Sequence, residues 1–312
     1  MSRALVRPLL ILLLLGATAA AFAVTEALKL EPPAISGTKT VKLFSPRCDC
    51  ATANASIAFR LRRADRMTVR IVDRDGRVVR TLEDDVSVPA GAQLLVWDGY
   101  DAQDRIAPNG VYHVRVRLAR SERQIQFPNA IRLDTTAPAI RLVGMSLAVL
   151  SPDGDGRGDK LEARYRLDER AHVTLYVDGR KAVGPSRLAS VEGKLDWYGK
   201  VDRRALAPGL YRVTLVARDL AGNVSTPTAP KVVRLRFVSL PIRVLHVRAG
   251  GTFGVRVDTD ARTVAWRLAR RRGSGAPRPL VLRAPERAGR YTLVVRVGGH
   301  AARATVLVTP RG

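Results

Sequence analysis

The sequence predicts an all-β protein in which tandem antiparallel β-sandwiches follow an N-terminal hydrophobic helix. Three observations lead to this class: apolar residues that alternate with polar ones, an internal repeat, and aromatic landmarks that recur in each copy. The alternation is seen at Ile57, Phe59 and Leu61 and is typical of a strand with one buried and one solvent-exposed face. The expected strands are short and follow one another closely along the chain, and no helical periodicity appears after residue 30. This pattern favours β-sandwiches in series.

The N-terminus carries an export segment. Arg3 and Arg7 precede an uncharged apolar run from Leu9 to Val24, which is long for a signal-peptide core and short for the ~20 residues of a membrane span. Ala21-Phe22-Ala23 offers a cleavage site before Val24. Residues 1–30 are therefore expected to be a cleaved signal peptide or a retained signal anchor that spans the membrane. Either alternative places the remainder outside, at the cell surface or secreted.

An internal repeat organises the following residues. Ser45-Pro46 and Ser151-Pro152 open two segments that align without a gap, and Asp49 falls on Asp155 in this alignment. Two copies of one alternating pattern predict two copies of one fold.

Each copy contains a second landmark. Trp97-Asp98-Gly99 is followed by Gly110-Val111-Tyr112, and Trp197-Tyr198-Gly199 is followed by Gly209-Leu210-Tyr211. The glycines are expected in turns and the aromatic rings at the ends of the core. A weaker third copy appears as Gly289-Arg290-Tyr291.

These landmarks define three modules. We expect a first module over residues 40–134, a second over 138–236 and a smaller third one over 242–312. The turn-rich stretch 134–138 separates the first two, and residues 237–242 lead to the third.

The landmarks resemble a known family. The Trp-Asp-Gly and Gly-x-Tyr pair, with Gly-Arg-Val-Val-Arg-Thr-Leu at 76–82 before it, is similar to the Ig-like domain of flagellar hook-capping proteins. The Ser-Pro-Asp-Gly-Asp-Gly stretch at 151–156 and the Asp-Leu-Ala-Gly-Asn stretch at 219–223 resemble motifs of bacterial surface modules. The resemblance covers about residues 40–235. It implies an extracytoplasmic, non-catalytic array of Ig-like or fibronectin-like sandwiches.

A Gly-rich loop in the second module is the candidate metal site. Asp153, Asp155 and Asp159 could converge on a calcium ion, since hard cations prefer carboxylate oxygens. Arg157 and Arg164 stand where an EF-hand loop has ligands, so this is not an EF-hand. The alternative is a turn that the aspartates stabilise without metal.

The corresponding loop of the first module contains both cysteines. Cys48 and Cys50 align with Gly154 and Gly156. Because an exported chain meets an oxidising environment, we expect a Cys48–Cys50 disulfide that replaces the cation, with intermolecular bonding as the alternative.

The charge narrows the class of partner. The formal net charge is +25, and only eight of the 53 basic residues are lysine. The arginines alternate along expected strands, and the dense run Arg270-Arg271-Arg272 is expected in a loop. Without a basic helical stripe this pattern argues against nucleic acid. It favours anionic cell-wall or membrane polymers, or a surface protein.

No catalytic motif emerges. His113, His172, His246 and His300 lie far apart in the sequence and outside any zinc or triad pattern. Trp266 alternates with apolar residues and is expected in the core. The sequence therefore predicts a structural, adhesive or scaffolding surface protein and no cofactor apart from the calcium considered above. The alternative is an accessory binding module for an extracellular hydrolase of polysaccharide or amide.

Overall fold

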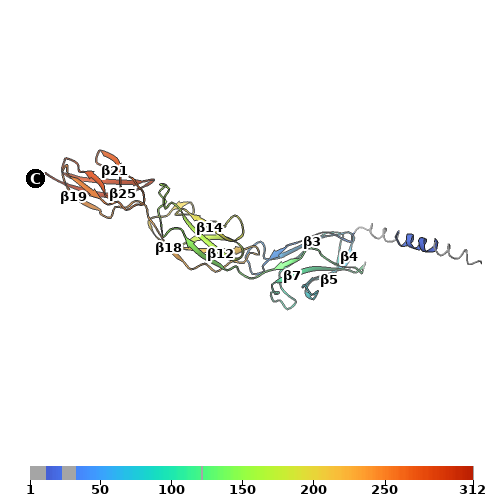
Figure 1. The fold of residues 1–312 in the computed structure, drawn as a ribbon. Helices are drawn as coiled ribbons and strands as arrows, with labels where there is room; N and C mark the ends of the chain where they lie inside the picture. Colours follow the sequence, from blue (N-terminus) through green and yellow to red (C-terminus); the bar gives the residue numbers. More distant parts are fainter. Residues whose placement is uncertain (1–11, 23–32, 121, 312) are drawn as a thin grey trace, which may run out of the picture. The chain divides into compact units, whose positions relative to one another are not determined.

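The computed structural model describes residues 12–22, 33–120 and 122–311. Residues 12–22 form a helix, and the regular elements after it are strands (Figure 1). This confirms the all-β class. No helix among the described residues has the length and apolar character needed to cross a membrane. Much of the expected export segment, including Arg3, Arg7 and the cleavage position before Val24, lies outside the described residues.

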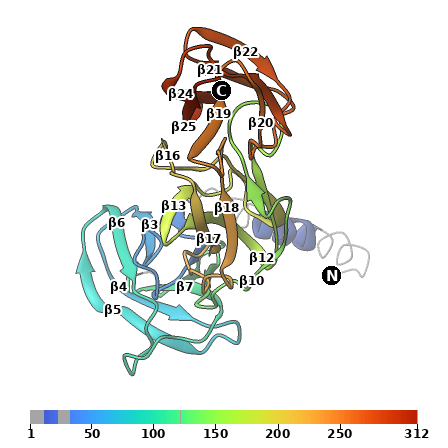
Figure 2. The same ribbon diagram turned by 90° about the vertical axis from the view of Figure 1, so that its left-hand side faces the viewer.

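The first module consists of two sheets. Its strands are β1 (Ile35–Thr40), β2 (Leu43–Phe44), β3 (Ala55–Leu61), β4 (Asp65–Val72), β5 (Val78–Val88), β6 (Gly91–Trp97), β7 (Gly110–Leu118), β8 (Gln124–Gln126) and β9 (Ile131–Leu133). One sheet has the order β1-β3-β6, and the other has the order β2-β9-β7-β4-β5 with β8 paired to β7. Figure 2 shows β3 and β6 on one side of this module and β4 and β5 on the other. The pairs are antiparallel except for the parallel pair β2–β9.

The second module repeats this plan with one long strand. Its strands are β10 (Ile140–Met145), β11 (Val149–Leu150), β12 (Leu161–Val177), β13 (Arg180–Val183), β14 (Ser190–Trp197), β15 (Lys200–Val201), β16 (Arg204–Ala205), β17 (Gly209–Asp219) and β18 (Lys231–Leu235). The first half of β12 pairs with β10 and β14, and its second half pairs with β17 and β13. This strand therefore takes the place of both β3 and β4 of the first module. Here too the short second strand of the module, β11, pairs in parallel with the last strand, β18.

The third module has a five-stranded sheet and a two-stranded one. Its strands are β19 (Val244–Arg248), β20 (Thr252–Val255), β21 (Val264–Leu268), β22 (Arg271–Gly275), β23 (Leu280–Arg283), β24 (Gly289–Val297) and β25 (His300–Thr309). The larger sheet has the order β19-β25-β24-β21-β22, and β20 pairs with β23. The expected loop at Arg270-Arg271-Arg272 is wrong from residue 271 on, because β22 pairs in full register with β21.

Each module has a hydrophobic core of its own. Trp97 and Trp197 are fully buried, and each indole N–H donates to a carbonyl three residues later, that of Tyr100 at 3.0 Å and that of Lys200 at 2.8 Å. Trp266 is partly buried against the third core. The chain divides into two compact units between residues 135 and 136, so that the second and third modules belong to one unit.

The Gly-x-Tyr landmark makes the same hydrogen bond in all three modules. The hydroxyls of Tyr112, Tyr211 and Tyr291 each donate to the carbonyl four residues upstream, at 2.5, 2.8 and 2.9 Å. A tyrosine that fixes a chain corner in this way is a feature of Ig-like sandwiches. The third module is therefore built around the same corner as the other two.

Candidate functional site

The Asp-Gly loop, residues 151–159, joins β11 to β12. The Ser151 N–H donates to the Gly158 carbonyl at 2.8 Å and closes the loop. Gly154, Gly156 and Gly158 have φ of 87°, 83° and 61°. Because side chains disfavour this region of backbone space, the sequence places glycine at these turns.

The three aspartates of the loop lie close together. Asp153, Asp155 and Asp159 can each place an oxygen within 4.8 Å of the other two. The Asp159 carboxylate accepts the N–H groups of Gly154 at 2.8 Å and Gly156 at 2.7 Å. The aspartates thus form hydrogen-bonded turns, which do not use all of the lone pairs of their oxygens.

A fourth carboxylate, which the sequence analysis missed, lies beside this loop. Asp260 of the third module is so close that a Cβ on Gly158 would lie 2.7 Å from its Oδ2. The Oδ1 atom of Asp260 is buried and has no hydrogen-bond partner among the described residues. No sequence pattern could reveal this proximity, since about 100 residues separate Asp260 from the loop.

Burial and the neighbouring carboxylates disfavour ionisation of Asp153. Asp153 is only 6% exposed, and burial raises its pKa to about 6, with further contributions from the charges of Asp155 and Asp260. No ion pair within the described residues neutralises any of these aspartates. An all-oxygen donor set with excess negative charge fits a hard divalent cation such as calcium.

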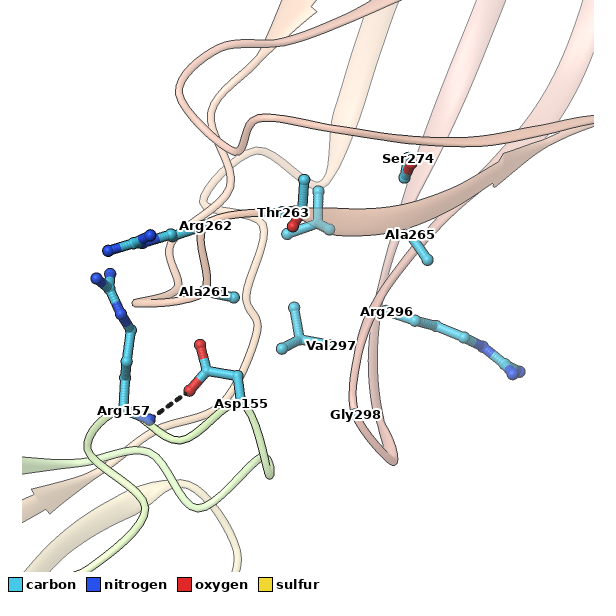
Figure 3. Close-up of a pocket in the computed structure, with 11 residues that line it drawn as sticks. Asp155, Arg157, Ala261, Arg262, Thr263, Ala265, Ser274, Arg296, Val297 and Gly298 are labelled. Carbon is cyan, nitrogen blue, oxygen red and sulfur yellow. Dashed lines mark hydrogen bonds between the residues drawn. The ribbon is translucent and has the colours of Figure 1, made fainter.

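The outer side of the loop borders an open hollow. Figure 3 shows Asp155 and Arg157 of the loop next to Ala261, Arg262 and Val297 of the third module. The N–H of Arg157 donates to Asp155 Oδ1 at 2.8 Å, and the hollow itself has walls of both charges.

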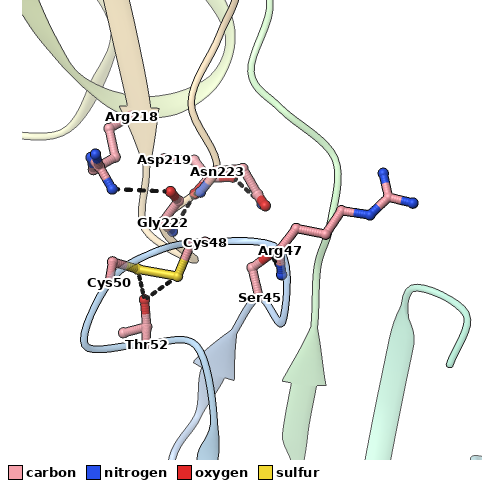
Figure 4. The surroundings of a disulfide bond; sticks show 9 residues. All are labelled: Ser45, Arg47, Cys48, Cys50, Thr52, Arg218, Asp219, Gly222 and Asn223. Atoms are coloured by element: carbon pink, nitrogen blue, oxygen red, sulfur yellow. Dashed lines mark hydrogen bonds between the residues drawn. A yellow bond between two sulfur atoms is a disulfide. The ribbon is translucent and has the colours of Figure 1, made fainter. Parts of the chain in front are cut away.

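The corresponding loop of the first module is closed by a disulfide. The structure joins Cys48 to Cys50 with an S–S distance of 2.10 Å, and Thr52 Oγ1 lies 3.1 Å from the Cys50 sulfur (Figure 4). The Ser45 N–H donates to the Thr52 carbonyl at 3.0 Å, which matches the Ser151–Gly158 bond. Cys48 and Cys50 occupy the positions of Gly154 and Gly156, whose N–H groups both donate to the Asp159 carboxylate. The disulfide and that carboxylate therefore connect equivalent positions in the two loops.

We expect these two connections to contribute similar stability. A disulfide across so short a loop stabilises by about 1–2 kcal/mol, as does a charged acceptor of two backbone hydrogen bonds. Urea unfolding should show losses of this size for Cys48→Ser with Cys50→Ser and for Asp159→Ala, but a change within about 0.5 kcal/mol for the control Asp49→Ala. Two alkylatable thiols without reductant would contradict the bridge.

The four histidines lie on different strands, namely β7, β12, β19 and β25. Nδ1 of His172 lies 2.7 Å from the Ser186 carbonyl oxygen. The His300 ring stacks on Phe237 with centroids 3.5 Å apart, and burial lowers the pKa of this histidine. These two imidazoles make structural contacts.

Several arginines lie on exposed strand positions. Arg60 on β3, Arg117 on β7 and Arg141 on β10 alternate with core residues and are exposed. Their charges form no ion pair among the described residues. The positive charge is therefore accessible to an anionic partner.

Comparison with known proteins agrees with the fold. Residues 47–122 match the FlgD Ig-like domain family, which confirms the expected resemblance for this part of the chain. The basal-body rod modification protein FlgD of Salmonella typhimurium is 39% identical over 62 residues, which are 20% of this chain and 26% of that protein. The FlgD of Escherichia coli K12 is 37% identical over 62 residues, with the same coverage. The chain thus spans about a quarter of the length of these curated relatives.

Solved structures of sandwich modules are also similar. The fibronectin(III)-like modules of Clostridium thermocellum CbhA are 14% identical, with a TM-score of 0.35, over 64% of this chain and 94% of that one. A 1.5-MDa bacterial ice-binding adhesin is 13% identical, with a TM-score of 0.32, over 90% of this chain and 99% of that one.

Proposed function

We propose that this chain is a non-catalytic, exported protein of the cell surface. Its Ig-like modules would form a structural, adhesive or scaffolding array that binds anionic cell-wall or membrane polymers. The observation that carries this proposal is the set of exposed, unpaired arginines on the strands of a chain with net charge +25. The apolar run after Arg3 and Arg7 supports export.

A second candidate is an accessory binding module for an extracellular hydrolase that acts on polysaccharide or amide. The exposed edge strands β6 and β14 favour it, since an unpaired edge can accept a strand of a partner protein. Copurification of a hydrolase from the producing cells would favour this candidate, whereas recovery of envelope polymer alone would favour the first.

The location of the chain in cell fractions tests the proposed export. We expect cell fractionation to recover the chain from the envelope or the medium, and protease added to intact cells to degrade residues 33–311. N-terminal sequencing then separates the two export routes, since material beginning at Val24 in the medium indicates a cleaved signal. Protease-resistant chain in the cytoplasm would contradict export.

We propose further that the Asp-Gly loop binds calcium as a structural ion. Asp153, Asp155 and Asp159 would hold it, and the buried Oδ1 of Asp260 would gain a positive neighbour. Calcium is expected to raise the unfolding temperature of the second module by several degrees at pH 7, and a chelator should reverse the change. Asp155→Asn should abolish this response. An equal response in that variant would contradict the site.

A further inference from the structure

The third module holds a disproportionate share of the positive charge. Residues 242–312 contain 15 arginines, no lysine and only three acidic side chains, so that their net charge is +12. Two of those acids, Asp258 and Glu286, pair with Arg256, Arg283 and Arg311. The arginines on the five-stranded sheet form no ion pair within the described residues.

Four of these arginines share one face of this sheet. Arg272, Arg267 and Arg303 lie in one cross-strand row, in which Arg267 pairs with Arg272 on one side and with Val294 on the other, and Val294 pairs with Arg303. The row crosses four neighbouring strands, which is a span of about 14 Å. Arg296 lies two residues from Val294 on β24 and therefore on the same face.

The face is hollowed between the arginines. Arg267, Arg272 and Arg296 line a hollow of about 370 Å³ together with Ala265, Trp266, Gly273 and Val294. Val294 is only 6% exposed although it points away from the core, and it lies between Arg267 and Arg303 in the row. The hollow thus has an apolar floor and guanidinium walls.

This arrangement has an electrostatic cost in the free protein. Like charges directly opposite each other on adjacent strands, as at Arg267 and Arg272, are destabilising. An anion placed between them removes this repulsion. Guanidinium groups bind phosphate oxygens through two parallel hydrogen bonds and are less strongly hydrated than ammonium groups.

We propose that the arginine face (Arg267, Arg272, Arg296 and Arg303) binds a linear polymer that carries phosphate groups. A row that crosses four strands suits a chain of regularly spaced charges. A lipid bilayer suits it less well, because the apolar residue of the row, Val294, is buried and cannot enter a membrane. The proposal rests on the proposed function, since it names the site and the ligand class for the anionic partner.

The test compares two variants of the full chain with the same net charge. Arg267→Gln, Arg272→Gln and Arg296→Gln remove the hollow's walls, whereas Arg60→Gln, Arg117→Gln and Arg141→Gln remove three exposed arginines elsewhere. Binding of inorganic polyphosphate to the chain in neutral detergent is measured at several salt concentrations. We expect the hollow variant to bind at least 10-fold more weakly and the control variant less than 3-fold more weakly. The hollow variant should also show a shallower salt dependence, because fewer counterions are released from the polymer.

Each alternative outcome is distinguishable. Equal weakening in the two variants would overturn the arginine face but leave the proposed function intact. Polyglutamate that binds as tightly as polyphosphate would overturn the phosphate class, and glycerophosphoglycerol that binds as tightly per phosphate would indicate a lipid headgroup instead of a polymer. Failure of the unaltered chain to bind any of these anions would count against the proposed function itself.

Discussion

Replacement of Trp97 by alanine is expected to lower the free energy of unfolding of the first module by about 3–5 kcal/mol. The indole is fully buried and makes edge contacts with Phe44 and Tyr112 at centroid distances of 5.3 and 4.9 Å. Its removal leaves a cavity at the end of the core and an unpaired carbonyl at Tyr100. Chemical denaturation, followed by hydrogen exchange of each module, measures the loss.

The adjacent residue provides a matched control. Val96 is 55% exposed on the same strand, so Val96→Ala should change stability by less than about 0.5 kcal/mol. Because the cores are separate, hydrogen exchange in the third module should not respond to Trp97→Ala. Similar losses from both substitutions would contradict the assignment of Trp97 as a core residue.

Replacement of Asp153 by asparagine is expected to stabilise the second module at pH 7 when a chelator removes divalent cations. The pKa of Asp153 is about 6 in the folded chain and 3.8 ordinarily, so the folded state binds this proton more tightly than the unfolded state. The contribution of the Asp153 carboxyl to the stability of the second module is therefore fully present below pH 3.8 and is lost as pH rises through 6. The shift corresponds to at most about 3 kcal/mol, of which Asp153→Asn should recover a part at pH 7.

The pH profile and calcium make this prediction specific. The advantage of Asp153→Asn should fall below about 1 kcal/mol at pH 4, where the wild-type carboxyl is protonated. The partly buried His300 has a lowered pKa and acts in the opposite direction below pH 6.5. It is present in both chains, so its effect cancels in the difference between them. In saturating calcium the sign should invert, because the variant loses a ligand. A variant less stable than wild type at pH 7 in chelator would contradict the electrostatic account.

Local patterns were sufficient to predict the all-β class and the buried faces of individual strands. Alternation identifies the buried faces of β3 and β4, and the Trp and Gly-x-Tyr landmarks identify the indoles and hydroxyls that make equivalent hydrogen bonds. These features depend on neighbours along the chain, so the sequence contains them directly.

Features that depend on distant residues could not be predicted. The approach of Asp260 to Gly158 requires the packing of one module against the next within the second unit. The arginine face depends on strand order, since Arg272 and Arg303 meet on one face only through β21 and β24. The run Arg270-Arg271-Arg272 was expected in a loop because charge density suggests exposure, which an edge strand also provides.

Retention on isolated cell envelopes tests the central claim most directly. The full chain is added in neutral detergent to detergent-extracted envelopes of the producing cells, and bound protein is measured as salt increases. The account predicts strong retention at about 50 mM salt and release by about 0.5 M, as screening shortens the range of the arginine charges. Absence of retention at low salt, or retention unchanged at high salt, would contradict an electrostatic surface-binding role.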